Sequence, residues 1–326
     1  MLFLGNSYTF FNDLEQVVES LLVASGTNVT ATRLAEPGWR LVDHLDAVGQ
    51  DGTAHAIAFA APLDWVILQE QSQIPGFPRT EAEWVYSREA AVALDGLVTG
   101  AGGDTMFLMT WGRRDGDPDN RTTYPDYRTM QDRLDEGYRD YVAAASADGT
   151  PAWIAPAGRA WSRVWDDVEA TGADPTEAGN AFHGLYVDDG SHPSVRGTYL
   201  AACVVYASLT GESPEGLPAP EGVPDAAYLQ AVAAAVVVDG EADIVYPWTE
   251  VDPDDTGDPD DTGGSDTDVS DTDVSDTDDT DRGADGTDTE GDGDPSGCGC
   301  GAPVGVPALA SIAALGALAA RRRPAA

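Results

Sequence analysis

The chain has 326 residues, enough for one large domain or two ordinary ones, and 42% of them are hydrophobic, so a substantial buried core is expected. Its formal net charge is −40, and all seventeen basic residues are arginine, so the chain lacks the basic face that nucleic-acid binding requires. We therefore expect no nucleic-acid partner. Its three cysteines are too few for a disulfide framework.

Composition divides the chain into three parts. Residues 1–250 have an ordinary globular composition and hold all eight tryptophans and all eleven tyrosines. Residues 251–296 are nearly all Asp, Thr, Gly, Ser and Pro, which bury too little apolar surface to offset the entropy of ordering. We expect a disordered acidic stalk there, open to glycosylation, with weak calcium binding as the alternative interpretation. Residues 297–326 form a separate C-terminal segment.

The first 250 residues alternate between strand-like and helix-like patterns. Short apolar runs predict strands at residues 1–5, 28–35, 64–72, 105–112 and 151–158. Apolar stripes at helical spacing predict helices at residues 13–26, 41–48, 81–98, 127–145 and 195–211. Asn12, with Glu15 three residues later, predicts a capping box at the start of the first of these helices.

This alternation predicts the α/β class. We expect a flavodoxin-like, parallel five-stranded sheet between two layers of helices, a three-layer α/β/α fold. Ligands of such sheets bind beyond the carboxyl ends of the strands. The polar turns that follow the predicted strands lie at those ends, so the fold predicts a single site there.

Ser7 and His192 are the candidates for chemistry at that edge. Ser7 follows the first strand and precedes a helix, and a serine nucleophile needs a base. His192 lies three residues after Asp189, a spacing that lets the carboxylate fix the imidazole tautomer and stabilise the imidazolium. The alternative is that Asp189 forms an Asx turn and His192 caps a helix. Packing or surface roles are expected for the other histidines, His44, His55 and His183.

Two segments resemble motifs of the SGNH (GDSL-like) hydrolase superfamily. LFLGNSYTFFNDL, from Leu2, is similar to its first block in the subgroup that reads Gly-Asn-Ser-Tyr/Phe-Thr. DGSHPSVRGTYLAA, from Asp189, resembles its last block, and DWVILQEQS also matches that subgroup. The resemblance covers roughly residues 1–210. It implies the SGNH hydrolase fold, with Ser7 as nucleophile, His192 as general base and then acid, and Asp189 as its orienter.

The resemblance also implies an oxyanion hole. The backbone N–H of Ser7 would contribute, and Gly38 matches the glycine of the second block. The Gly-x-Asn of the third block is missing from the end of the third predicted strand. Gln69, Gln71 and Ser72 are the candidates to donate in place of that asparagine. Loss of one such donor typically costs about 2.7–4 kcal/mol of transition-state stabilisation, so we expect some group to supply it.

Aromatic and arginine residues at strand ends give weaker signals. Trp39 and Trp111 are candidate walls of a substrate groove, although Trp111 fits a role in covering the end of the sheet equally well. Arg113 and Arg114 are candidates for contact with an anionic substrate, but exposed arginines are usually only solvated.

An aspartate-rich loop beside them resembles a calcium loop. It contains Asp115, Asp117 and Asp119. However, Asn120 stands where an EF-hand needs glycine, and Asp126 stands where it needs a bidentate glutamate. We therefore expect no metal, and no cofactor.

The C-terminal segment resembles a sorting signal processed by myxosortase-type enzymes. That resemblance implies processing at Cys298 or Cys300 by a sorting protease. Residues 302–320 are uncharged and near the length that spans a bilayer, and three arginines follow them. We expect membrane contact through residues 302–323 before processing, and an exported, surface-anchored protein. No leader precedes Leu2, so we expect a signal peptide to be encoded upstream.

These features together predict a serine ester hydrolase. We expect it to remove acetyl or short acyl groups from a carbohydrate or a similar extracellular small molecule through an acyl-enzyme. The alternative is a non-catalytic, cell-surface glycan-binding module on the same fold, which the missing Gly-x-Asn and the asparagine at position 6 favour.

Overall fold

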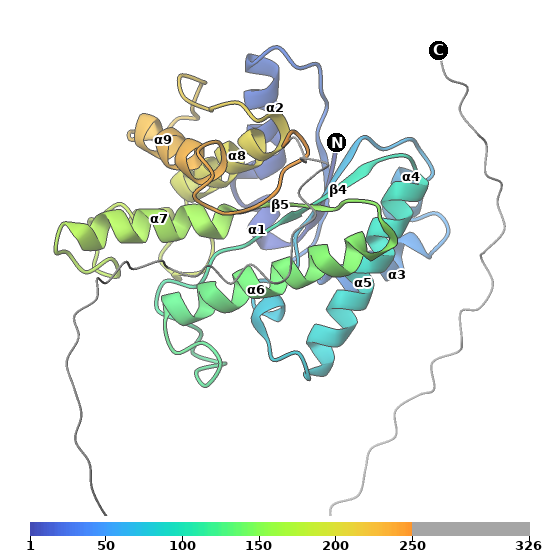
Figure 1. The fold of residues 1–326 in the computed structure, drawn as a ribbon, viewed down its shortest axis with the longest axis horizontal. Helices are drawn as coiled ribbons and strands as arrows, with labels where there is room; N and C mark the ends of the chain where they lie inside the picture. The colour runs from blue at the N-terminus through green and yellow to red at the C-terminus, as the bar shows by residue number, and fades with distance from the viewer. Residues whose placement is uncertain (250–326) are drawn as a thin grey trace, which may run out of the picture. The chain divides into compact units, whose positions relative to one another are not determined.

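A parallel sheet forms the centre of the protein. The computed structural model describes residues 1–249 (Figure 1). Its strands are β1 (Leu2–Gly5), β2 (Thr32–Ala35), β3 (Trp65–Leu68), β4 (Asp104–Leu108) and β5 (Trp153–Ala155). They lie in the order β2-β1-β3-β4-β5, and every neighbouring pair is parallel. The predicted five-stranded parallel sheet is confirmed.

The central strands are apolar on both faces because each face packs against helices. Phe3, Ile67 and Met106 belong to one buried cluster, and the next residue of each strand belongs to the other. Successive side chains of a strand point to opposite faces of a sheet, so short continuous apolar runs can fill two cores at once.

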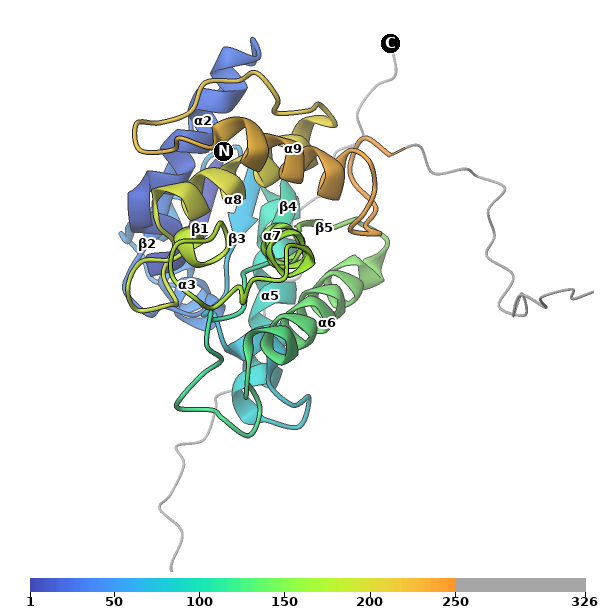
Figure 2. The same cartoon turned by 90° about the vertical axis from the view of Figure 1, so that its left-hand side faces the viewer.

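Helices cover both faces of the sheet. Figure 2 shows the strands between the two helical layers. One layer contains α2 (Leu14–Ala24), α7 (Ala157–Ala170), α8 (Val195–Thr210) and α9 (Ala226–Val237). The other contains α3 (Leu41–Val48), α5 (Ala82–Gly100) and α6 (Tyr127–Ala145). The short helices are α1 (Ser7–Phe10), α4 (Ala54–Phe59), η1 (Phe11–Asp13), η2 (Ile74–Gly76), η3 (Ser146–Asp148) and η4 (His183–Leu185). The three-layer α/β/α arrangement is therefore the predicted one.

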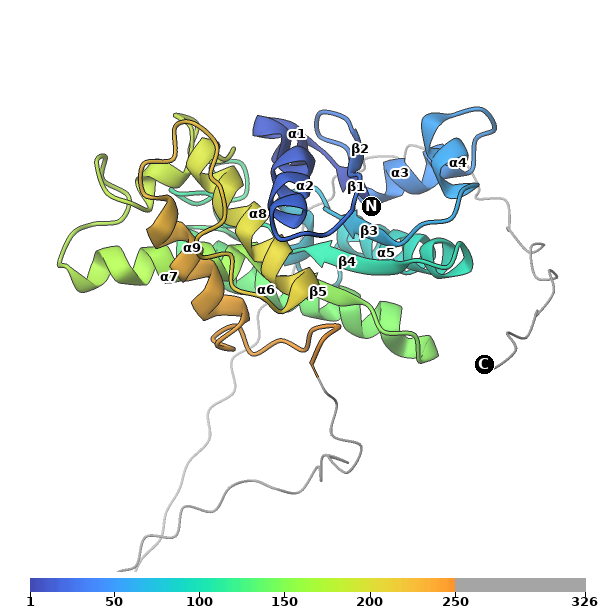
Figure 3. The same ribbon diagram turned by 90° about the horizontal axis from the view of Figure 1, so that it is seen from above.

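The first helix does not begin as predicted. Asn12 has a φ of 54° and lies in η1, and Asp13 takes the N-cap position of α2 without a side-chain cap hydrogen bond. The Asn12 side chain instead donates to the Pro193 carbonyl, at 3.1 Å, and to the Thr198 hydroxyl, at 2.9 Å. The predicted capping box is thus wrong, because a long-range contact to the start of α8 takes the side chain. Figure 3 shows α2 beside α8.

Several other boundaries differ from the predictions. Helices α4, α7 and α9 were not predicted, and the strand expected at 151–158 ends at Ala155, because α7 begins two residues later. Within residues 1–249, no helix combines the length and apolar character needed to cross a membrane. The predicted stalk, Cys298, Cys300 and the apolar run at 302–320 lie outside the described residues.

Candidate active site

Ser7, His192 and Asp189 form one hydrogen-bonded chain. The Ser7 Oγ lies 2.8 Å from the His192 Nε2, and the His192 Nδ1 lies 2.6 Å from the Asp189 Oδ2. An ionised aspartate only accepts, so Nδ1 carries the proton and the neutral ring accepts from the serine hydroxyl at Nε2. Residues up to 185 positions apart in sequence therefore have the arrangement that a nucleophile, its base and a group that orients the base would need.

The histidine loop holds Asp189 in place through its own backbone. The other carboxylate oxygen, Oδ1, accepts from the backbone N–H groups of Ser191, at 2.8 Å, and His192, at 2.9 Å. Burial acts to raise the pKa of Asp189, but the hydrogen bonds from His192 and Ser191 outweigh it and hold this pKa below its ordinary value. Asp189 therefore stays ionised at neutral pH, as an orienting carboxylate must.

The Ser7 turn is fixed by buried side chains from other elements. The Gln69 Oε1 accepts from the Asn6 backbone N–H and from the Thr9 hydroxyl, both at 2.9 Å. Asn6 in turn accepts from the Tyr8 N–H and donates to the Trp39 carbonyl, at 2.8 Å. A Cβ on the preceding residue, Gly5, would lie 2.6 Å from the Gln69 Oε1. Glycine at this position lets the turn close tightly over β3.

A buried histidine pair lies beneath the same turn. The His44 Nε2 donates to the Gly5 carbonyl, and its Nδ1 accepts from the His55 Nε2, each at 2.9 Å. Burial lowers the pKa of His44 to about 4 and also lowers the pKa of His55. Both rings are thus neutral near pH 7, and their hydrogen bonds support the end of β1. His44 and His55 therefore have the packing role that was expected for them.

Aromatic contacts tie the histidine loop to the Ser7 side of the site. Phe11 stacks on His192, with ring centroids 4.4 Å apart. The Tyr8 hydroxyl lies 2.6 Å from the Ser191 Oγ, and Tyr8 stacks on Trp111. The Trp111 Nε1 donates to the Ser191 carbonyl. Together with Asn12, these contacts set the position of the base relative to the nucleophile.

A small pocket of about 140 Å³ opens beside Ser7 and His192. Gly38, Gln71, Ser72 and Arg113 also line it. The Gly38 N–H has no backbone acceptor in the part of the chain that the structure describes, and Ser7 is the first residue of α1, whose N–H has no intrahelical acceptor. The structure thus brings together several donors that can face a carbonyl oxygen at Ser7.

The candidate glutamine donors occupy different places. The Gln71 Nε2 donates one hydrogen to the Gln73 Oε1, at 2.6 Å, which leaves its second N–H for the pocket. Gln69 does not line the pocket; it is buried and its amide supports the Ser7 turn and the Glu70 carbonyl. Gln69 is therefore corrected as an oxyanion candidate, because its side chain is buried and does not line the pocket, whereas Gln71 and Ser72 do.

Glu70 connects the two loops that carry the candidate oxyanion donors. Its buried Oε1 accepts from the backbone N–H groups of Leu41, at 3.1 Å, and Gln71, at 2.6 Å, and its Oε2 accepts from the Ser87 hydroxyl. Leu41 lies three residues after Gly38. Burial raises the pKa of Glu70 to about 7, since the hydrogen bonds only partly offset the loss of solvent. This side chain thus holds the Gly38 loop against the Gln71 loop.

The two predicted groove tryptophans do not line the pocket at Ser7. The prediction for Trp111 is wrong, because its side chain is fully buried and lies between Tyr8 and Trp161, 4.1 Å from the latter ring. Trp39 is partly exposed but lines a separate hollow with His55 and stacks on that ring. The burial of Trp111 agrees instead with the alternative role given above, in which this side chain covers the end of the sheet.

The sequence did not reveal that Gln69 supports the Ser7 turn, or that Glu70 has any role at the site. Both follow the apolar core of β3, and polar residues at that point of a buried strand were the available signal. The structure also places Arg113, a weak candidate from sequence, in the pocket with Ser7. Within residues 1–249, no group of three or more His, Cys, Asp or Glu side chains is arranged to hold a metal ion.

No protein-family model matches the chain, and no curated protein matches it. Among solved structures, a DUF4886 family protein from Bacteroides uniformis is similar, with a TM-score of 0.56 and 18% identity over 73% of this chain and 94% of that one. A protein from Slackia heliotrinireducens, described as a candidate SGNH hydrolase, has 28% identity and a TM-score of 0.46 over 63% of this chain and 95% of its own.

Axe2, an acetylxylan esterase from Geobacillus stearothermophilus, is a further similar structure. It has 14% identity and a TM-score of 0.41 over 63% of this chain and 89% of its own. The likeness to the Bacteroides uniformis protein shows a shared fold.

Proposed function

We propose that the protein is a serine ester hydrolase of the SGNH type. The observation that carries this proposal is the hydrogen-bonded chain from Ser7 through His192 to Asp189. A serine whose hydroxyl donates to a histidine, itself oriented by an ionised aspartate, is activated for attack on a carbonyl carbon. The N–H groups around the adjacent pocket can donate hydrogen bonds to the oxyanion that develops during this attack.

The reaction has two steps. The Ser7 Oγ attacks the ester carbonyl while the His192 Nε2 takes its proton, and the tetrahedral oxyanion accepts hydrogen bonds from the N–H groups of Ser7 and Gly38 and from the Gln71 amide. The imidazolium then gives its proton to the leaving alcohol, which leaves an acyl group on Ser7. Water, activated by His192, releases this group as a carboxylic acid and restores the serine.

The size of the pocket favours short acyl groups. A volume of about 140 Å³ accommodates an acetyl or similarly short group, whereas a long lipid chain would have to extend out of the pocket. We infer that acetyl or short acyl esters on carbohydrates, or on similar extracellular molecules, are the substrate class. Such substrates suit a site that opens at the edge of a sheet.

We also propose that the protein acts at the cell surface. The resemblance of residues 297–326 to a sorting signal supports this, with Cys298 or Cys300 as the processing site. Residues 302–323 would contact the membrane before a sorting protease acts. Fractionation of cells that express the chain with and without residues 297–326 tests the proposal, and equal distribution of the two forms would contradict it.

Hydrolysis of p-nitrophenyl acetate by the full chain tests the catalytic role of Ser7. We expect turnover by the wild type and a loss of at least about 10³-fold in kcat for Ser7→Ala, because the nucleophile is removed. Ser20→Ala, at an exposed position on α2, is the matched control and should keep full activity. If the wild type shows no turnover, or Ser7→Ala matches it, the esterase proposal fails and the glycan-binding alternative takes its place.

A further inference from the structure

A second, larger cavity of about 650 Å³ lies beside the candidate triad. Asp189 and Ser191 of the histidine loop line it, as does Arg113. Arg113 and Ser191 also line the small pocket at Ser7, so the two hollows share a wall. The volume falls in the range of about 300–1,000 Å³ that small-molecule sites occupy. An ester with its acyl group in the small pocket would therefore place its alcohol part in this cavity.

The acids that line this cavity already have partners. Asp117 pairs with Arg113, at 2.7 Å, and Asp115 pairs with Arg114, at 2.8 Å. Both oxygens of Asp189 accept hydrogen bonds from the histidine loop. The acceptors that the cavity offers are thus largely occupied by protein donors.

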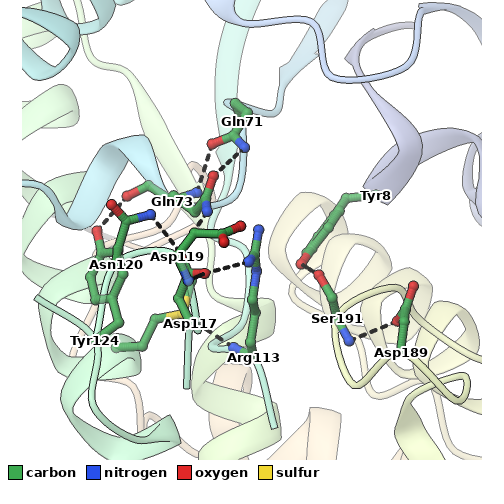
Figure 4. Close-up of polar contacts among 11 residues, drawn as sticks. Tyr8, Gln71, Gln73, Arg113, Asp117, Asp119, Asn120, Tyr124, Asp189 and Ser191 are labelled. Carbon is green, nitrogen blue, oxygen red and sulfur yellow. Dashed lines mark hydrogen bonds and ion pairs between the residues drawn. The ribbon is translucent and has the colours of Figure 1, made fainter. Parts of the chain in front are cut away.

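The cavity also contains a cation without such a partner. The Arg121 guanidinium forms no ion pair within residues 1–249. Arg113 uses one terminal nitrogen, Nη1, for Asp117, and its buried Nε has no hydrogen-bond partner among the described residues. Figure 4 shows Arg113 between the Asp117 network and the Tyr8–Ser191 pair. Two arginines therefore line the cavity with N–H groups that have no protein acceptor among the described residues, and one of them, Arg113, also lines the pocket at Ser7.

The loop that carries Arg121 is anchored by buried groups. The fully buried Asp117 side chain accepts from Gln73, at 2.5 Å, and from Asn120, at 2.7 Å (Figure 4). The Tyr124 hydroxyl donates to the Gln73 carbonyl, and the Tyr124 N–H donates to the Asn120 carbonyl. The backbone on both sides of Arg121 is thus anchored by a buried network, while the Arg121 side chain itself is exposed to solvent.

We propose that this cavity binds the alcohol part of the ester and that Arg121, with Arg113 lining the same cavity, binds a carboxylate there. This inference rests on the proposed esterase function. Guanidinium groups pair with carboxylates through charge-assisted, often bidentate hydrogen bonds. The substrate class is then an acyl ester whose alcohol part carries a carboxylate near the ester.

A matched pair of esters tests the proposal on the full chain. Para-acetoxybenzoate and para-acetoxybenzamide share the acetyl group and differ in whether the alcohol part carries a carboxylate. We expect the wild type to have the higher kcat/KM for the benzoate. Arg121→Gln should lower the benzoate-to-benzamide ratio about fivefold to twentyfold, and Arg121→Lys should lower it less, because it keeps the charge. Salt at about 1 M should also reduce the ratio.

Arg88→Gln is the matched control. Arg88 is an exposed arginine on α5 that does not line the cavity, and we expect this variant to keep the wild-type ratio. Arg113 is not varied, because its removal would leave the buried Asp117 without its cation.

Calorimetric binding of the two products, para-hydroxybenzoate and para-hydroxybenzamide, provides a readout that needs no turnover. Tighter binding of the benzoate that depends on Arg121 supports the subsite even if neither ester is hydrolysed, a result that would overturn only the esterase proposal. The inference is overturned if Arg121→Gln leaves both the ester ratio and the binding of para-hydroxybenzoate unchanged.

Discussion

The two sides of the candidate active site are held in different ways. The Ser7 turn is buried, and its contacts come from residues far away in sequence, such as Gln69 and His44. The histidine loop is partly exposed, with 27% of the His192 side chain and 47% of the Asp189 side chain accessible. The hydrogen bonds that orient the imidazole come from residues within three positions of His192.

Because of this difference, the groups that orient the imidazole are not the groups that stabilise the fold. A group that acts locally and near solvent can be lost with little effect on packing, whereas a buried polar group that serves distant backbone atoms cannot. We therefore expect substitution of Asp189 to change the reaction alone. Substitutions beneath Ser7 should change the reaction and the free energy of unfolding together.

Asp189→Asn is expected to have the largest effect. The amide cannot stabilise the imidazolium and favours the wrong imidazole tautomer, so kcat for p-nitrophenyl acetate should fall by about 10²–10⁴-fold. The urea midpoint of unfolding should stay near that of the wild type, since the side chain is half exposed. Asp188→Asn, at the exposed neighbouring position, is the control. A large loss of stability in Asp189→Asn would remove the contrast between the two sides.

Gln69→Leu tests the buried side. It leaves the Asn6 N–H and the Thr9 hydroxyl without their shared acceptor, and each unsatisfied buried group costs about 1–3 kcal/mol. We expect a loss of about 2–4 kcal/mol in the free energy of unfolding, measured with urea, and a lower kcat because the Ser7 turn shifts. Gln50→Leu, at an exposed position, should change neither quantity. An unchanged urea midpoint for Gln69→Leu would show that the turn does not depend on this acceptor.

The same contrast explains which features the sequence could predict. The parallel five-stranded sheet and its two helical layers followed from apolar periodicity, and the candidate triad followed from two short motifs and the family that they resemble. The Asp189–His192 contact is local, so its spacing in the sequence was informative. Helices α4, α7 and α9 were missed, and the predicted capping role of Asn12 was wrong.

The remaining errors have one physical cause. Asn12, Gln69 and Trp111 each have a role set by partners that are distant in sequence, such as Thr198 for Asn12 and Ser191 for Trp111. A single sequence reports which polar groups follow a strand, but not which buried backbone atoms they must satisfy. The choice among Gln69, Gln71 and Ser72 therefore needed the packing of the turn over β3.

Glu70 sharpens the comparison, because it adds an ionisable group to the buried side. Its pKa is raised from an ordinary value of 4.5 to about 7, mainly by burial. Between these values the unfolded chain has lost this proton while the folded chain keeps it. The stabilising contribution of Glu70 is therefore fully present below about pH 4.5 and is lost as the pH rises through 7.

Glu70→Gln removes this titration while keeping the size of the side chain and its acceptor for Leu41 and Gln71. We expect the stability of the variant relative to the wild type to increase by about 1–3 kcal/mol between pH 5 and pH 8, measured by urea unfolding. The Ser87 hydroxyl and the Arg40 guanidinium favour the charged form of Glu70 and thereby limit the rise of its pKa to about 7. Asp46→Asn, at an exposed position on α3, should show no such trend. A difference between Glu70→Gln and wild type that stays constant with pH would mean that Glu70 is ionised in the folded protein throughout this range.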